Sequence, residues 1–392
     1  MRVPRRIGSL VFVSSFLTTA ALVAVPSGPA MAAAPNAPRV GPPTDVAARG
    51  RADWPQFGFS AAGTRSNPFE HVIDPSNVSQ LTTAWTYSVP APLRTSPTVA
   101  GGRVYVGGND QHLDALDVAT GTLDWSKNLR QRISTTPAVA NGTVYVGLQN
   151  GTLTARDAAT GAPRWSVSIG GAHTLESPTV AGNVVYASTT SGTLTALDGA
   201  TGGTLWSDSF GGKVSSAAVD AGAVFVAAGT DLVSVHASDG TTNWTTPVGA
   251  SFEPSPAVAH GTVFVTTSAL HAVDEASGTE LWSAPATSEP AVANGRVFAT
   301  SFATIEALDA RTGTLVWSHT LPRKAFSDVP AEANGLVYVG AATNHLYAYD
   351  EVSGRQLLKF SVLHVPFSSP SVTGGRVFVT FAGTQMALEL PG

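Results

Sequence analysis

Charged side chains make up only 12% of the 392 residues. They nevertheless recur in short stretches, here called links, each of which precedes one copy of a repeated sequence motif that often begins with Ser-Pro. Six of them, three basic and three acidic, are the candidates for a site: Arg94, Arg132, Glu176, Lys213, Glu253 and Asp328. Arg and Lys bind anions through charge-assisted hydrogen bonds, and paired acids can hold a cation or transfer a proton. We therefore expect these six to form a ligand-binding ring. The alternative is that they form a solvated surface, whose ion pairs contribute at most about 1 kcal/mol each to the stability of the fold.

Other chemistries are not favoured. The absence of Cys excludes disulfides, thiolate zinc sites, a cysteine nucleophile and a lipid-modified N-terminal Cys. The His residues show no ligand spacing, and no nucleophile elbow, phosphate loop or HExxH motif occurs. A net charge of −5 argues against a nucleic-acid binder. We predict no catalytic residue and no metal ligand.

The links belong to a repeat. Phrases such as SPTVAGGRVYVGG occur eight times, starting at Ser96, Thr136, Ser177, Ser216, Ser255, Glu289, Val329 and Ser369. A second phrase follows the first seven and ends in Trp, or in Leu358 at the seventh. From Trp85 to Leu358 seven steps cover 273 residues, a mean of 39. This period is typical of a β-propeller blade.

Within each unit the hydrophobic pattern has period two, and Gly, Asn and Asp mark the turns, which predicts four short antiparallel strands. The eighth copy ends at Met386–Leu390 without a fourth strand, whereas Leu81–Val89 reads as a fourth strand without a blade. We predict an all-β, eight-bladed propeller whose last blade is closed by this N-terminal strand, leaving no open edge between first and last blades.

One Trp per blade is expected to dock each sheet against its neighbour, since a buried indole covers roughly 150–250 Å². These structural residues are Trp85, Trp125, Trp165, Trp206, Trp244, Trp282 and Trp317. An Asp and a Gly precede most of them at fixed spacing, as in Asp117 and Gly121. Asp caps backbone N–H groups and Gly accepts a positive φ, so we read this row of Asp as turns rather than as calcium ligands.

The consensus SPxVxxGxVYVG…LxALDxxTGxxxW resembles the repeat of pyrroloquinoline-quinone (PQQ) dehydrogenases and their relatives over residues 85–390. The preceding Trp54–Phe57 and Gly63–Pro68 are similar to the opening of those enzymes. The resemblance implies an eight-bladed, usually exported propeller. It does not imply the quinone, because many relatives carry the repeat without a cofactor and serve as scaffolds or assembly factors.

The sequence departs from the enzymes of that family. It lacks their adjacent cysteines and their long blade insertions, and no motif matches their calcium ligands or catalytic Asp. It also lacks the Cys that lipid-anchored assembly factors require. We therefore expect no cofactor and lean away from an enzyme.

The N-terminus reads as an export signal. Arg2, Arg5 and Arg6 precede an apolar run from about Leu10 to Val25, and small residues follow up to Ala32. We predict a signal peptide over 1–32, a disordered Ala/Pro-rich linker over 33–50, an extension packed on the propeller over 51–80, and the propeller over 81–392. The export route, Sec or twin-arginine, stays open. No further apolar stretch approaches membrane length, so we expect a secreted or cell-envelope monomer that is not a lipoprotein.

The leading functional hypothesis is a binding or scaffold module for a protein, peptide or glycan. The alternative is a small quinoprotein-type oxidoreductase that uses PQQ and calcium on an alcohol or sugar. A lyase or hydrolase that uses the acids of the ring is a third possibility.

Overall fold

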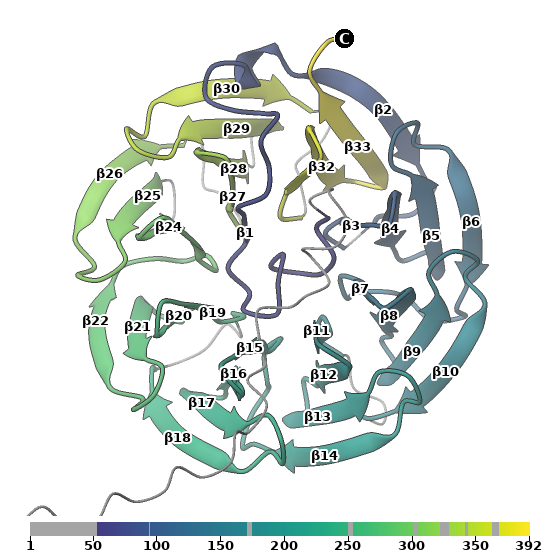
Figure 1. The fold of residues 1–392 in the computed structure, drawn as a ribbon, viewed down its shortest axis with the longest axis vertical. Coiled ribbons are helices and arrows are strands. Elements are labelled where there is room, and N and C mark those ends of the chain that lie inside the picture. Colours follow the sequence, from purple (N-terminus) through teal and green to yellow (C-terminus); the bar gives the residue numbers. More distant parts are fainter. Residues whose placement is uncertain are drawn as a thin grey trace, which may run out of the picture. The chain divides into compact units, whose positions relative to one another are not determined.

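Each repeat folds into four short antiparallel strands, and the eight sheets stand in a ring (Figure 1). The computed structural model describes residues 53–93, 95–170, 175–249, 254–301, 304–321, 329–341, 344–362 and 368–392. All of these belong to the second of two units of the chain, Val40–Gly392. The predicted signal peptide and linker, residues 1–50, lie outside the described residues. The prediction of an eight-bladed propeller is confirmed.

Each blade extends from the channel outward, and blades 1 to 8 follow the order of the chain. The innermost strands are β3 (Thr98–Ala100), β7 (Ala138–Ala140), β11 (Thr179–Ala181), β15 (Ala218–Asp220), β19 (Ala257–Ala259), β23 (Ala291–Ala293), β27 (Ala331–Ala333) and β31 (Ser371–Thr373). The second strands are β4 (Arg103–Gly107), β8 (Thr143–Gly147), β12 (Val184–Ser188), β16 (Ala223–Ala228), β20 (Thr262–Thr266), β24 (Arg296–Ser301), β28 (Leu336–Ala341) and β32 (Arg376–Phe381).

The third strands are β5 (His112–Asp117), β9 (Thr152–Asp157), β13 (Thr193–Asp198), β17 (Asp231–His236), β21 (Leu270–Asp274), β25 (Thr304–Asp309), β29 (His345–Asp350) and β33 (Thr384–Glu389). The outermost strands are β6 (Leu123–Asn128), β10 (Pro163–Ser168), β14 (Thr204–Ser209), β18 (Thr242–Pro247), β22 (Glu280–Ala284), β26 (Leu315–Thr320), β30 (Gln356–Ser361) and β2 (Thr82–Ser88). A two-residue strand, β1 (Ser66–Asn67), and a 3-10 turn, η1 (Val78–Gln80), precede them.

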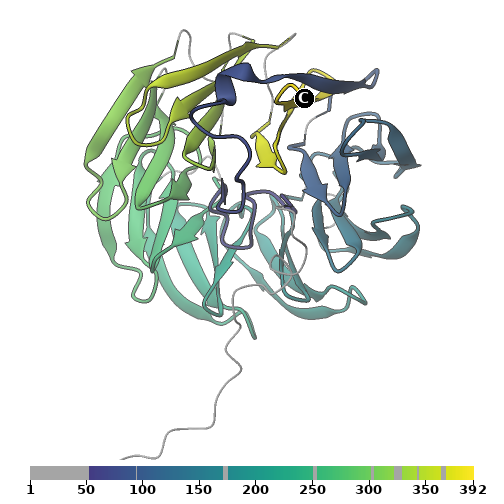
Figure 2. The same cartoon turned by 45° about the horizontal axis from the view of Figure 1, so that its top comes forward.

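The last blade is completed from the other end of the chain, as predicted. Strand β2 pairs antiparallel with β33, and Thr82 lies opposite Glu389 while Ser88 lies opposite Thr384. The two strands run side by side in both views (Figures 1 and 2). The ring is thus closed by hydrogen bonds between segments that stand about 300 residues apart in the sequence.

Each Trp docks on the next blade. Seven indole Nε1 atoms donate to a backbone carbonyl in the neighbouring blade, over 2.9–3.2 Å. The turn glycine of that blade lies against the ring, and a Cβ built on Gly240 would stand 2.7 Å from Trp206. An aromatic residue of the second strand packs beside each Trp, as Tyr186 does at 6.0 Å from Trp206. Adjacent blades are therefore joined by one repeated contact.

The aspartates of the third-strand turns cap the backbone. The Asp117 carboxylate accepts the N–H groups of Ala119 and Thr120 and the Thr120 hydroxyl, and these bonds hold its pKa below the usual range. In blade 4, where His236 replaces the Asp, Asp239 accepts the Thr241 N–H and hydroxyl instead. The row of Asp thus serves turns.

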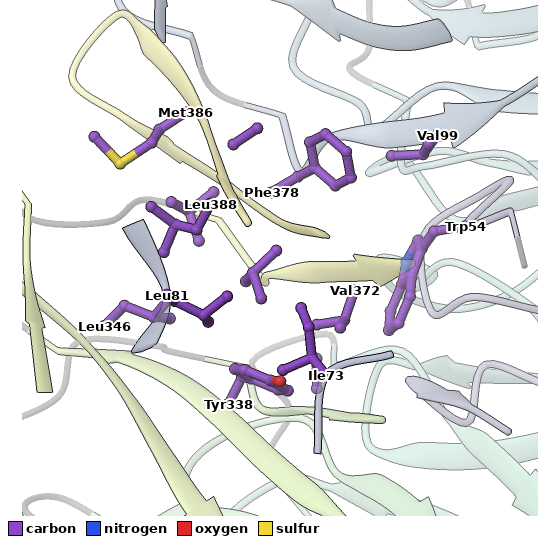
Figure 3. Packing of buried hydrophobic residues seen from close by; sticks show 14 of the residues in the cluster. Trp54, Ile73, Leu81, Val99, Tyr338, Leu346, Val372, Phe378, Met386 and Leu388 are labelled. Carbon is purple, nitrogen blue, oxygen red and sulfur yellow. The ribbon is translucent and has the colours of Figure 1, made fainter. Parts of the chain in front are cut away.

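Leu358 replaces Trp at the seam between blades 7 and 8, because blade 8 has no third-strand turn for an indole to cover. Its fourth strand comes from the N-terminus, so β30 contacts η1 instead. Leu358 joins a buried apolar cluster with Val78, Leu81 and Leu388. Figure 3 shows part of this cluster, in which Trp54, Ile73 and Leu81 of the N-terminal segment meet residues of blades 7, 8 and 1. In the described part of the chain, no helix is long and apolar enough to cross a membrane.

Candidate functional site

The central channel is occupied by the chain itself. Residues 54–67 run along it before the first blade begins, and they curl past the innermost strands in blade order (Figure 1). The inner edge of each innermost strand faces the axis with unpaired backbone groups, which must find partners. The segment supplies those partners. We call residues 54–67 the channel segment.

One hydrogen bond or more joins the channel segment to the central residue of every innermost strand. Trp54 exchanges two backbone bonds with Val99, and the Gln56 side chain exchanges two with Val180. The Asn67 amide donates to the Val372 carbonyl over 2.7 Å. The remaining five central N–H groups donate to segment carbonyls over 2.7–2.8 Å: Val139 to Pro55, Val219 to Ala61, Val258 to Ala62, Val292 to Thr64 and Glu332 to Arg65.

Gly63 lets the segment pass close to the blades. Its φ is +67°, and a Cβ there would stand 2.6 Å from the carbonyl oxygen of Pro256. Only glycine accepts both the left-handed backbone and this approach without strain.

A buried arginine fixes the C-terminal part of the segment. The Arg65 side chain is fully buried, lies 5.0 Å from the Phe57 ring centre, and pairs with Glu289 at 2.5 Å. Its guanidinium also donates to three backbone carbonyls, those of Gly63, Ser255 and Pro290. Glu289 in turn accepts the Ser255 N–H over 2.7 Å. This ion pair ties the segment to blades 5 and 6.

Glu332 is the one acidic residue at the centre of an innermost strand, where the other seven blades have Val. It is buried, and its carboxylate accepts hydrogen bonds from the Ser66 hydroxyl and the Gly335 N–H. Burial, with a smaller contribution from the nearby Glu351, raises the pKa of Glu332 to about 7 against the lowering effect of those two donors. A carboxyl that titrates near neutrality thus faces the channel segment.

The described residues of the links that lead to the innermost strands of blades 1 to 4 lie on one face. In blades 1 to 4 a bridge ties each link to the far end of the second strand, as Ile133 pairs with Leu148. Of the six predicted site residues, Arg132, Glu176 and Lys213 lie on the links of blades 2, 3 and 4; the first and last are exposed and Glu176 is half-buried. Arg94, Glu253 and Asp328 lie outside the described residues. The structure therefore brings three of the six to one face, which we call the link face.

Calcium takes six to eight oxygen ligands, so a quinone–calcium site needs several acidic or amide groups at one point. Among the described residues, no group of three or more His, Asp or Glu side chains is placed to hold a metal ion. The inner strand edges are also bonded to the channel segment. The described residues do not fit PQQ with calcium, and we derive no redox step from them.

Arg65, Glu289 and Glu332 were not among the predicted site residues. Two of them depart from the repeat. Glu289 replaces the usual Ser in EPAVANG, and Glu332 replaces the usual Val in VPAEANG. The backbone bonds of the channel segment carried no signal in the sequence, since the segment mostly accepts them and every residue has a backbone carbonyl.

Comparisons with known proteins agree with the eight-bladed fold. A family model described as outer membrane protein assembly factor BamB matches residues 79–227, 190–302 and 301–388. The crystal structure of BamB from Moraxella catarrhalis has a TM-score of 0.69 and 17% identity, covering 79% of this chain and 99% of that one. Quinohemoprotein alcohol dehydrogenase from Comamonas testosteroni has a TM-score of 0.78 and 16% identity, covering 90% and 83%.

A europium-containing methanol dehydrogenase is similar to the same extent, with a TM-score of 0.75 and 13% identity over 88% of this chain and 99% of that chain. At these identities the likeness concerns the fold alone. No protein of curated function matches the sequence at a significant level.

Proposed function

Because the chain belongs to the family of PQQ-like β-propellers described as outer membrane protein assembly factor BamB, we propose that it is a cofactor-free binding and scaffold module of the cell envelope. Its partner is a protein, which it meets on the link face. The family's description as an assembly factor and the predicted export signal support this place and role.

One observation carries the proposal: the channel segment bonds to the innermost strand of every blade. A propeller that acts on small substrates needs part of its channel for them, whereas here the chain itself takes the inner edges. Recognition is thereby left to the outer surfaces. Of these, the link face presents the exposed cations Arg132 and Lys213 beside Glu176 in a chain with few charges. Such charges steer a partner and set its orientation.

Site-specific photo-crosslinking in the native cell tests this idea. A photoreactive residue at Arg132 or Lys213 should crosslink to one and the same protein. The same residue at Asp220, which is exposed at the opposite end of an innermost strand, serves as the control. With the purified partner, combining Arg132→Ala and Lys213→Ala should weaken binding by roughly tenfold and leave the Tm unchanged. Crosslinks of equal yield from both faces, or none from the link face, would overturn the proposal.

The quinoprotein alternative is tested separately. Purified protein is mixed with PQQ and Ca²⁺, and bound chromophore and dye reduction with alcohols or sugars are measured. We expect neither. A stoichiometric chromophore with turnover would make the protein an oxidoreductase.

A further inference from the structure

A second feature lies on the outer rim, between blades 1 and 2, and does not depend on the proposed function. A hollow of about 240 Å³ opens there. It is formed by β9 and β10 of blade 2 together with the residues that follow β6 and β8. Its walls include Leu129, Leu148, Thr154, Arg156, Arg164 and Ser166.

Arg156 breaks the pattern of the repeat at this point. The penultimate residue of the third strand is buried and apolar in the other seven blades: Leu116, Leu197, Val235, Val273, Leu308, Tyr349 and Leu388. In blade 2 alone an arginine takes this place in the seam. Arg156 is half-buried there, so its charge is hydrated less well than on the surface and a paired carboxylate would stabilise it.

The described residues do not provide that partner. Arg156 forms no ion pair with them; its Nη1 donates to the Gly161 carbonyl over 2.9 Å, and its Nε is buried without an acceptor. Burial lowers the pKa of this group, as expected for a cation removed from water without a carboxylate beside it. A guanidinium has five N–H donors, so most of them remain available.

The surroundings add positive charge. Arg164 also lines the hollow, but its guanidinium donates to Thr143 over 2.6 Å and to Asp157 over 2.8 Å, whose side chains point to the other face of the sheet from Arg156. The Lys127 side chain of blade 1 lies over Gly161, close enough that a Cβ there would stand 2.7 Å from its Cε. Asp157 therefore pairs with Arg164 and caps its own turn rather than pairing with Arg156, whereas Lys127 lies over the glycine whose carbonyl accepts the Arg156 bond.

We propose that this hollow is a binding site for a carboxylate carried on a short apolar stem. The carboxylate would accept hydrogen bonds from Arg156, with Ser166 and Thr154 at its side, and the stem would lie against Leu129, Leu148 and Pro163. The apolar wall favours an organic acid over inorganic phosphate. Two sources share this chemistry: a free short-chain acid and a glutamate side chain of a bound protein.

Calorimetry on the full chain with hexanoate, hexanamide, phosphate and a capped glutamyl peptide tests the site. Hexanoate or the peptide should bind, while hexanamide and phosphate should not. Whichever of the two binds more tightly identifies the source, and either result supports the site. No binding of either carboxylate at millimolar concentration, or equal binding of phosphate, would overturn the proposal.

Arg156→Leu restores the residue type of the other blades and should weaken carboxylate binding by tenfold or more. Its Tm without ligand should equal or exceed that of the wild type, because an unpaired charge leaves the seam. Arg311→Leu, at an exposed position of the corresponding turn of blade 6, is the matched control and should bind as the wild type does. A lower Tm for Arg156→Leu would assign Arg156 to structure and overturn the site.

A second variant tests the site independently, in case Arg156→Leu does not fold. Ser166 is exposed on β10 and lines the hollow. Ser166→Glu places a carboxylate of the chain itself beside Arg156, and it should abolish hexanoate binding while the protein stays folded. Unchanged hexanoate binding in this variant would place the ligand elsewhere.

Discussion

Glu332 shows how one side chain can make the assembly respond to pH. It sits where seven blades have valine, against Ser66 of the channel segment, with Glu351 nearby and no cation bonded to it in the described part of the chain. Its two hydrogen-bond donors do not offset the loss of water around the carboxylate, so the neutral form is favoured in the fold.

This raised pKa predicts a specific pH dependence. The unfolded chain releases the Glu332 proton near pH 4.5 and the folded chain near pH 7. Between these values the native state binds more protons, so the contribution of Glu332 is fully present below pH 4.5 and is lost as the pH rises to 7. The loss amounts to about 3 kcal/mol.

Glu332→Gln stays neutral at all pH values and removes this dependence. Urea denaturation of both proteins at several pH values measures it: the stability of the variant relative to the wild type should rise from pH 4.5 to 7 and then level off. Parallel curves for the two proteins would show that Glu332 titrates normally.

Arg65 holds the channel segment through four acceptors, including the Glu289 carboxylate. Arg65→Met keeps much of the side-chain volume but leaves that carboxylate without its cation. We expect a loss of about 3–5 kcal/mol in the free energy of unfolding. Combining it with Glu289→Gln should recover part of this loss, since no unpaired charge then remains. Additive losses in the double variant would mean that the two groups act independently.

At the scale of the element, the contact between an indole and the next blade's turn is the repeated unit of assembly. It combines a hydrogen bond from Nε1, a glycine beneath the ring and an Asp cap in the same turn. The glycine is required twice, once by its positive φ and once by the ring above it.

Two glycines of blade 4 allow these two requirements to be measured separately, because both have a positive φ but only one lies under an indole. Gly240 has a φ of +77° and lies under Trp206, whereas Gly222 has a φ of +84° and open space around its Cα. Substitution by Ala at either position should cost about 1 kcal/mol for the backbone. Gly240→Ala should cost a further 1–3 kcal/mol, roughly, because the new methyl group displaces the indole. Thermal melts of both variants measure the difference; equal losses would show that the indole yields without strain.

The strands and turns could be predicted from the sequence, because each blade repeats the same pattern of residue types. The Val-Tyr-Val runs, the Asp-to-Gly turns and the missing fourth strand of the eighth copy are visible in the residue types. The occupant of the channel was not predictable in this way. Its bonds are mostly between backbone groups, and such bonds leave no trace in side-chain composition. Arg156 and Glu332 were visible only as breaks in a pattern.

At the scale of the whole molecule, closure depends on the pairing of β2 with β33. The hydroxyls of Ser88 and Thr384 lie 2.9 Å apart across this pair. The chain has no native Cys, so Ser88→Cys with Thr384→Cys offers a single possible disulfide. It should raise the free energy of unfolding by about 2–5 kcal/mol, because it closes a very long loop in the unfolded chain.

Melting curves with and without a reducing agent measure this gain, and Ser88→Cys alone is the control. A reduced double variant should melt as the control does. Failure of the bond to form in the folded protein would contradict the register of the two strands.

The channel segment has one more consequence, which concerns the order of events during synthesis. Asn67 and its acceptor Val372 stand 305 residues apart, and the segment leaves the ribosome first. Its partners are made blade by blade, and the last of them belongs to blade 8. A nascent chain therefore contains the channel segment before its last blade has been made. During that interval chaperones and proteases encounter a propeller that is not yet closed.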